Sequence, residues 1–246
     1  SLIKKVLSNP ENIKKGLDIL RKKGLKETLE VAESQKDTKN SLGYSLSGAI
    51  VKIGSDITEF KVGDRVACAG AGKANHAEFV AIPRNLTVKI PDNLDFQSAS
   101  SVTLGAIAMQ GLRRADVKLG ENIAVIGLGL LGQISIQLLK ANGARVIGFD
   151  IDDKKVNLSK ALKIDQSYNS LKNNVLEKIS NFTQGKGVDA TIITASAPNN
   201  NEIIQQAMEM TRKKGRVVVI GDIGLGPKRT PFYEKEIDYL ISTSYG

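Results

Sequence analysis

The sequence has little cysteine, histidine or aromatic side chain. Cys68 and His76 are the only residues of their kinds, tryptophan is absent, and only 4% of the residues are aromatic. A single cysteine excludes an intramolecular disulfide, which is typical of a reducing compartment. Zinc takes three or four cysteine, histidine or carboxylate ligands, so this composition also argues against a zinc site. The sequence therefore predicts a metal-free protein with an aliphatic core.

Long apolar runs are absent as well. The sequence has no stretch of about 18 apolar residues that could span a membrane, and its start, SLIKKVLSNPENIKKG, lacks the apolar region of a signal peptide. We therefore expect a cytoplasmic protein without a membrane partner. The net charge is +9, but the lysines alternate with acidic residues and no aromatic residues interleave with them. This pattern predicts a solvated basic surface rather than a nucleic-acid partner.

The chain divides into three segments of different texture. Residues 1–41 are basic and predicted to be helical, with a helix start at Asn9-Pro10-Glu11 and a stop at Gly24. Residues 42–100 hold short β-type runs, YSLSGAIVKIG, DRVACAG, AEFVAI and LTVKI, separated by turn residues. Residues 95–115 are predicted to be helical, and they lead into a third segment, 101–246.

The third segment alternates strands with helices. The predicted strands are 122–126, 145–149, 188–194, 215–220 and 238–243, with a weaker one at 166–168. The predicted helices are 130–141, 153–162, 171–183 and 201–213. Such alternation predicts an α/β fold, a doubly wound parallel sheet covered by helices on both faces.

Three glycines interrupt the apolar stretch IAVIGLGLLGQ at residues 123–133. Gly127 permits a tight turn after the strand, Gly129 lets the backbone approach a pyrophosphate, and Gly132 lets the helix pack against the strand. The backbone between them (Leu128, Leu130 and Leu131) would present N–H groups at a helix N-terminus. The alternative is a strand–helix corner that holds no ligand, and the context of the motif favours the dinucleotide.

An acidic residue completes this pattern. Asp150 ends the next strand, 23 residues after Gly127, where a carboxylate accepts hydrogen bonds from the adenine ribose. Its charge would repel a 2′-phosphate and so favours NAD, although Lys154 or Lys155 could reach such a phosphate and leave NADP open. Two later strands end in small residues that leave room for a nicotinamide ring. These candidate cofactor residues are Thr194, Ala195, Ile220 and Gly221.

The order of segments resembles the medium-chain dehydrogenase/reductase superfamily. The resemblance rests on LGYSLSGAIVKIGSDITEFKVGDRVACAG, then ANHAEFVAIP, then VKLGENIAVIGLGLLG, and it covers residues 42–246. It implies a partial GroES-like domain followed by a Rossmann domain. CAGAGKANHAEFV and PFYEKEIDYLISTSYG further resemble a zinc-less group of two-domain oxidoreductases linked to polysaccharide biosynthesis. Against this family the chain looks like a fragment, and the family's sixth strand implies a homo-oligomer.

The zinc ligands of the family are missing here. Tyr44 and Ser45 stand where the resemblance places a His-Glu pair, and Val102 stands near its third ligand. The resemblance therefore implies an NAD(P)-dependent, zinc-independent oxidoreductase. Its substrate would be a small alcohol or carbonyl compound or an activated alkene, with a sugar derivative as one case. The alternative is a module that binds the dinucleotide without turnover.

Few side chains remain for acid–base chemistry. Tyr44 is a candidate proton donor or substrate partner, although a half-buried structural tyrosine is the alternative. His76 is expected to be a structural histidine in a strand, with a proton shuttle as the alternative, and Cys68 a small buried hydrophobe. Ser45 and Ser47 lack a nearby His–Asp pair that would make either of them a nucleophile.

Overall fold

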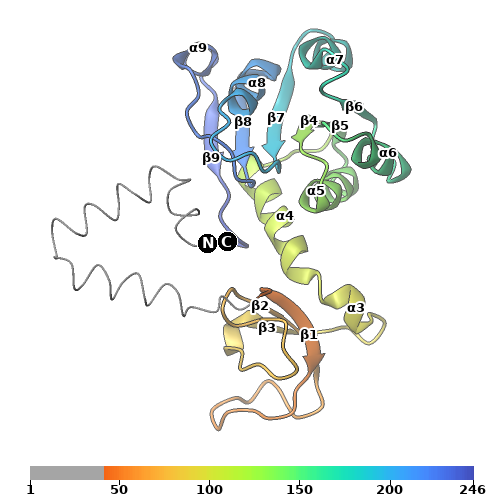
Figure 1. Ribbon diagram of the computed structural model, residues 1–246, viewed down its shortest axis with the longest axis vertical. Coiled ribbons are helices and arrows are strands. Elements are labelled where there is room, and N and C mark those ends of the chain that lie inside the picture. Colours follow the sequence, from red (N-terminus) through yellow and green to blue (C-terminus); the bar gives the residue numbers. More distant parts are fainter. Residues whose placement is uncertain (1–41) are drawn as a thin grey trace, which may run out of the picture.

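The computed structural model describes residues 42–246, which form two sheets joined by one long helix. The small sheet has the order β1-β2-β3, and the large sheet has the order β6-β5-β4-β7-β8-β9. Helix α4 (Val102–Ala115) runs between them (Figure 1). The helix predicted at Asn9-Pro10-Glu11, with the rest of residues 1–41, lies outside the described residues.

The large sheet is parallel throughout. Its order places the first strand, β4, between β5 and β7, so the strand order reverses there, as in the doubly wound dinucleotide-binding fold. The predicted α/β class is therefore confirmed. The strands are β4 (Asn122–Ile126), β5 (Arg145–Asp150), β6 (Gln166–Asn169), β7 (Val188–Ile193), β8 (Thr211–Val219) and β9 (Asp238–Ile241).

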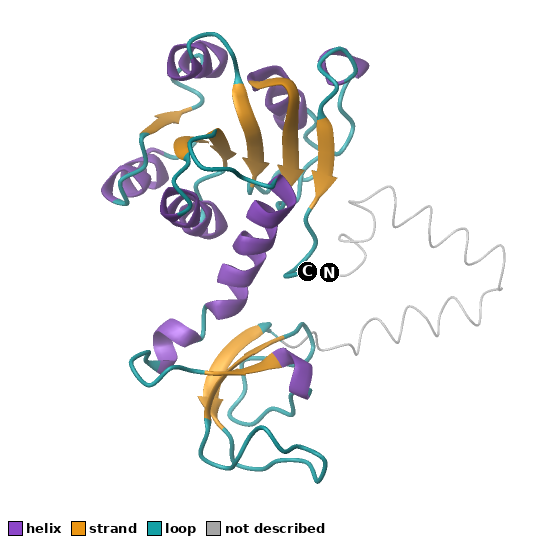
Figure 2. Ribbon diagram, turned by 180° about the vertical axis from the view of Figure 1, so that it is seen from behind, coloured by secondary structure: helices purple, strands orange, loops and turns teal. Residues whose placement is uncertain are grey.

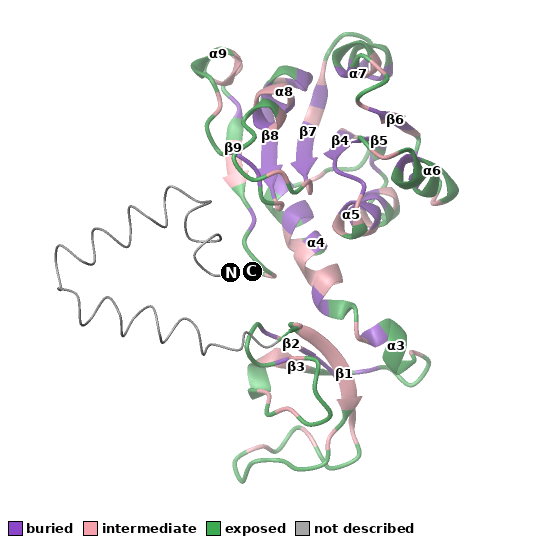
Figure 3. Ribbon diagram, viewed as in Figure 1, coloured by how far each residue is buried: buried purple, intermediate pink, exposed green. Residues whose placement is uncertain are grey.

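Helices cover both faces of this sheet. α4, α5 (Leu130–Ala141) and α6 (Asp153–Ala161) enclose one apolar cluster, and α7 (Val175–Thr183) and α8 (Glu202–Met210) enclose the other. Neighbouring residues of β4 contribute to opposite clusters, as strand geometry requires. Figure 3 shows the strands β7 and β8 as largely buried. This aliphatic core holds the carboxyl ends of the strands in place.

Two helix boundaries differ from the prediction. α7 begins at Val175 rather than near residue 171, because the Asn174 side chain caps it by accepting from Glu177 N at 3.2 Å. α8 ends at Met210, and β8 begins at the next residue, Thr211. The Thr211 hydroxyl lies 2.7 Å from the carbonyl oxygen of Ala207 and 2.8 Å from the hydroxyl of Thr191. These contacts hold Thr211 in an extended conformation, within the range 201–213 that was predicted to be a helix.

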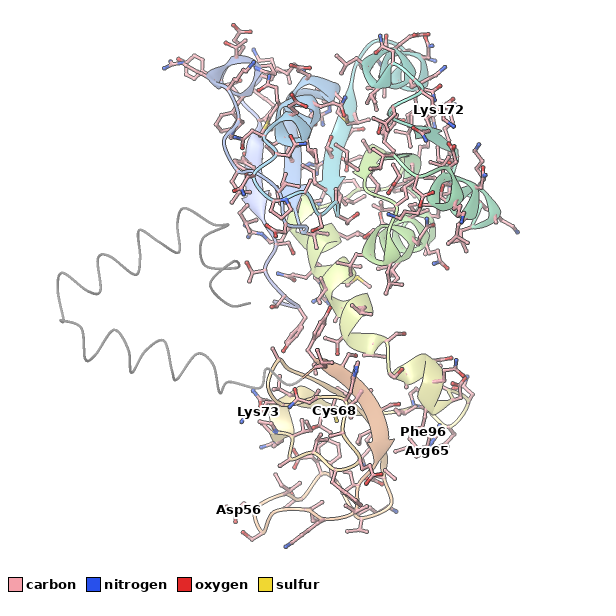
Figure 4. All side chains as sticks on the ribbon, viewed as in Figure 1. Asp56, Arg65, Cys68, Lys73, Phe96 and Lys172 are labelled. Atoms are coloured by element: carbon pink, nitrogen blue, oxygen red, sulfur yellow. The ribbon has the colours of Figure 1, made fainter. Side chains whose placement is uncertain are left out.

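The small sheet is antiparallel. It consists of β1 (Ser45–Ala49), β2 (Arg65–Ala69) and β3 (Thr87–Lys89), with a 3-10 turn, η1 (Arg84–Leu86), before β3. Arg65 lies over the Phe96 ring, 4.8 Å from its centroid, and both are labelled in Figure 4. Phe96 begins α3 (Phe96–Ala99), so the predicted helical segment 95–115 is two helices.

The run AEFVAI at 77–82 is not a strand, contrary to expectation. Its residues find no partner strand among residues 42–246, and Phe79 is 76% exposed. One further short helix, α9 (Arg229–Phe232), was not predicted. Among the helices of residues 42–246, none has the length and apolar character that a membrane span requires. The segment bounds 1–41, 42–100 and 101–246 stay predictions.

Candidate functional site

The first turn of the candidate site is built around Gly127, directly after β4. Its φ of +93° is unfavourable for a residue with a side chain. Its N–H donates to Phe149 O on β5 at 2.8 Å. A Cβ atom at this position would lie 2.6 Å from the Ala195 nitrogen. The turn therefore requires glycine both for its conformation and for the approach of the loop after β7.

The next two glycines have different surroundings. A Cβ atom at Gly132 would overlap the carbonyl oxygen of Gly127, so the start of α5 packs directly on the turn. A Cβ atom at Gly129 would meet no atom within 4 Å. Among the residues between them, Leu128 is buried, Leu130 is 63% exposed and Leu131 is intermediate. Gly132 thus serves packing, and Gly129 faces open space.

The N-terminus of α5 lies beside this open space. The first turn of α5 carries no acidic residue, and no side chain caps it. The first N–H groups of a helix have no acceptor within the helix, and they carry the positive end of its dipole. An anionic group next to Gly129 would therefore meet unpaired donors and a favourable field.

Asp150 is tied directly to the glycine turn. Its carboxylate is buried, with Oδ2 accepting from Leu128 N at 2.7 Å and Oδ1 accepting from Asp152 N at 2.9 Å. Lys155 Nζ lies 3.8 Å from Oδ1. The sequence predicted the position of Asp150 at the end of β5 but not its bond to Leu128. A carboxylate can accept more than these two hydrogen bonds, so Asp150 still has lone pairs for ligand hydroxyls.

The ends of β7 and β8 lie next to the same turn. Thr194 Oγ1 donates to Gly127 O at 2.6 Å, and Ala195 N donates to Ile126 O at 3.1 Å. The N–H groups of Ile220 and Gly221 both donate to Ile193 O, at 2.9 and 3.0 Å. A Cβ atom at Gly221 would overlap the Ala195 carbonyl oxygen. The structure thus brings the predicted cofactor residues of four strands to one edge of the sheet.

Gln133 also belongs to this group, although the sequence did not single it out. Its Nε2 donates to Leu128 O at 2.8 Å and to Lys155 O at 3.0 Å. The signal that could have found it is a glutamine at the end of the apolar run GLGLLGQ. A buried amide at that place needs a reason, since most buried polar groups in proteins form hydrogen bonds.

Tyr44 lies apart from these residues, on the small sheet. It immediately precedes β1, which begins at the end of the β-rich part nearest the large sheet and runs away from it (Figure 2). Tyr44 is 40% exposed. His76 is exposed and lies in a loop beside Gly43, so its predicted placement in a strand was wrong.

Cys68 and the two serines have structural contacts. Cys68 is buried, as expected, inside the β-rich part (Figure 4), and burial raises the pKa of its thiol. Ser45 Oγ donates to Ser100 O and Ser47 Oγ donates to Phe96 O, each at 2.5 Å. These bonds attach β1 to α3 and the residues that precede α4.

The residues present do not fit a zinc ion. The positions at which the family resemblance implies zinc ligands carry Tyr44, Ser45 and, near the third, Val102, none of which is a thiolate, imidazole or carboxylate. The Ser45–Ser100 bond attaches Ser45 to the residues just before α4, whose first residue is Val102. No group of three or more His, Cys, Asp or Glu residues that could hold a metal exists within 42–246.

A cavity of about 290 Å³ lies elsewhere, within the β-rich part. It opens beside the apolar cluster of Val66, Cys68 and Ala74. Its lining includes Leu46, Ile57, Phe60, Phe79 and Ile82, and none of the candidate cofactor residues. It is therefore separate from the glycine turn.

Two family models match the chain. One, described as a zinc-binding dehydrogenase, matches residues 131–244, and the other, an alcohol dehydrogenase GroES-like domain, matches residues 16–92. The second match includes the small sheet. The first match includes the large sheet from α5 onward, that is, all of its strands except β4. The expected GroES-like and Rossmann parts are thus confirmed.

Known relatives agree with these matches. An alcohol dehydrogenase of Geobacillus stearothermophilus is 30% identical over 207 residues, and an uncharacterised zinc-type alcohol dehydrogenase-like protein of Escherichia coli K12 is 26% identical over 211 residues. The alignments cover 73% and 74% of this chain, and the chain spans 60% of the length of each relative. The crystal structure of an alcohol dehydrogenase superfamily protein from Novosphingobium aromaticivorans is similar, with a TM-score of 0.71 and 26% identity, over 82% of this chain and 61% of that one.

Proposed function

The chain belongs to the medium-chain dehydrogenase/reductase superfamily, and from that premise we propose that it is an NAD(P)-dependent oxidoreductase. It would move a hydride between the nicotinamide ring and a small alcohol, carbonyl compound or activated alkene. The observation that carries this proposal is the glycine turn at the reversal of strand order, with Asp150 bonded to its Leu128 N–H. When bound, the nicotinamide supplies the redox chemistry.

The roles of the chain's own residues follow from their places. The N-terminus of α5 and Gly129 would bind the pyrophosphate, and the Asp150 carboxylate would accept from the adenine ribose hydroxyls. Its negative charge favours NAD over NADP, although Lys155 partly offsets this charge. The residues after β7 and β8 would border the nicotinamide. We keep Tyr44 as the candidate proton donor toward the substrate.

Zinc independence forms part of the proposal. It is supported by the absence of thiolate, imidazole and carboxylate groups at Tyr44, Ser45 and Val102. Polarisation of a substrate carbonyl would then come from side-chain or backbone donors. Prolonged dialysis against a zinc chelator should leave NADH binding and turnover unchanged. A loss that added zinc restores would contradict this part.

The first test is cofactor binding. NADH at millimolar concentration should raise the melting temperature and enhance nicotinamide fluorescence, and NADPH should do so less. If neither dinucleotide produces either signal, the proposal fails. A panel of alcohols, aldehydes, quinones and sugar derivatives then tests turnover.

The missing ligand set favours a second candidate, a module that binds the dinucleotide without turnover. It predicts the same NADH binding but no absorbance change at 340 nm with any member of the panel. Turnover of a single compound would exclude it. A homo-oligomer formed through β9 is compatible with both candidates, and so is the cytoplasmic location that we predicted.

A further inference from the structure

Gln133 is a polar side chain that lies buried beside the glycine turn, as Asp150 does. It lies in the first turns of α5, is 6% exposed, and its Nε2 donates to the carbonyl oxygens of Leu128 and Lys155. Both acceptors are carbonyls, so the orientation of the amide is fixed by chemistry. Its Oε1 is buried without a partner among the described residues. Since an unpaired buried acceptor is unfavourable, the two donor contacts are what this side chain contributes.

These contacts belong to a network of hydrogen bonds that connects Asp150, the glycine turn and α6. Asp150 holds the N–H of Leu128, and Gln133 holds its C=O. Gln133 also holds the Lys155 carbonyl, in the first turn of the helix that follows Asp150. The glycine turn and the start of α6 are therefore fixed to each other through one amide group.

The consequence falls on Gly129. In a planar trans peptide the C=O and the following N–H point in opposite directions. Because Leu128 O is turned inward to Gln133, the N–H of Gly129 is turned outward. That N–H has no hydrogen-bond acceptor among residues 42–246, and the space beside Gly129 is open.

We propose that Gln133 is a positioning residue for dinucleotide binding. It orients the Leu128–Gly129 peptide so that the Gly129 N–H donates to a phosphate oxygen of the pyrophosphate. It also fixes that donor relative to Asp150, which would bind the ribose of the same ligand. This inference rests on the proposed function, and it adds a side chain that touches no ligand atom.

The test replaces the amide while keeping its length. Gln133→Met removes both donors, and it should raise the dissociation constant for NADH about tenfold, the loss expected for one hydrogen bond to a charged group. Gln137→Met is the matched control. Gln137 lies one turn further on α5, is exposed, and donates to Gln133 O rather than to the turn. The control should change the dissociation constant less than about twofold, since exposed side chains contribute little.

A second readout separates positioning from general stability. In the unmodified protein, NADH should shift the Gly129 amide proton resonance downfield. In Gln133→Met this shift should be smaller, although the variant is measured at a temperature at which it is folded. If Gln133→Met fails to fold, the resonance in the unmodified protein decides. If the unmodified chain does not bind NADH, the proposed function is contradicted, and so is this inference, which depends on it. If it binds NADH but the Gly129 resonance does not move, or Gln133→Met binds equally well, only this inference falls.

Discussion

At the scale of single residues, Asp150 has two tasks that one substitution series can separate. Its carboxylate holds Leu128 N and carries the charge that would bind a ribose and repel a 2′-phosphate. Asp150→Asn keeps an acceptor oxygen but removes the charge, whereas Asp150→Ala removes both. We expect NADH binding to weaken about tenfold in Asp150→Asn and further in Asp150→Ala. NADPH binding should be unchanged or stronger in Asp150→Asn.

Fluorescence titration with the two dinucleotides measures these changes. The matched control is Asp152→Asn, since Asp152 lies two residues away and caps α6 through Lys154 N. It should lower stability slightly and leave the NADH/NADPH preference as it was. Equal loss of both dinucleotides in Asp150→Asn would contradict the charge argument.

The glycines of the turn give a second prediction at this scale. Gly132→Ala places a methyl group on the Gly127 carbonyl oxygen, so α5 must move away from the turn. Overpacking of this kind costs about 1–3 kcal/mol, or a melting temperature lowered by about 3–10 °C. Gly129→Ala meets open space at a φ of −70°, so the fold should keep its melting temperature.

The two variants should therefore separate stability from binding. Gly129→Ala should weaken NADH binding, because its methyl group stands where the phosphate approaches. Thermal melts without ligand, followed by NADH titration, provide both quantities. A Gly129→Ala protein that binds NADH as tightly as the unmodified chain would show that the phosphate lies elsewhere.

The sequence predicted these positions because a local pattern encodes them. The spacing of Gly127, Gly132 and Asp150 follows from a strand, a helix and the next strand. The bonds of Leu128 to Asp150 and to Gln133 could not be predicted, since which polar atoms meet across the fold is set by tertiary packing. The same limit explains His76, since the strand expected around it has no partner strand among residues 42–246.

At the scale of elements, the end of α8 is set by a distant side chain. Lys235 Nζ donates to the carbonyl oxygens of Met208, Glu209 and Thr211 at 3.2, 2.6 and 2.8 Å. The last carbonyls of a helix lack partners and carry the negative end of its dipole, so an ammonium group suits them. The helix predicted at 201–213 extended past this point because the periodicity of a segment cannot indicate a contact with a residue as distant in sequence as Lys235.

Lys235→Met should therefore destabilise α8 more than a surface change would. Burial lowers the pKa of Lys235, and the negative charge of Glu209 offsets part of this effect. We expect the loss of these bonds to cost about 1–2 kcal/mol, or a few degrees in melting temperature. Lys213→Met, at an exposed position of β8, is the control and should have little effect. Equal melting temperatures for the two variants would contradict the capping role.

At the scale of the whole molecule, the strands of the large sheet point toward the β-rich part (Figures 1 and 2). The glycine turn, Thr194 and Gly221 all lie at these carboxyl ends. β1, which Tyr44 precedes, begins on the side of the small sheet that faces them. A ligand bound at the glycine turn would thus extend toward the part of the chain that we expect to hold the substrate. Under the proposed function, hydride transfer would therefore take place between the two sheets.

The outer edge of the large sheet leads to a prediction about self-association. β9 pairs only with β8 among the described residues, so its other edge presents unpaired N–H and C=O groups. Such an edge is a template for pairing with a second copy, and Ile241 at its end is 45% exposed. We expect the chain to form dimers through β9. Light scattering should then give a mass of about twice 26.5 kDa.

Ile241→Lys should convert these dimers to monomers, because a lysine on an edge strand disfavours pairing of that edge with a second copy. Leu158→Lys is the control, because Leu158 is an aliphatic residue of similar exposure, 52%, on α6 at the other side of the sheet. It should leave the mass unchanged. Because the glycine turn lies within one chain, monomers of Ile241→Lys should still bind NADH. A monomeric unmodified chain, or dimers that persist in Ile241→Lys, would show that β9 is not the contact.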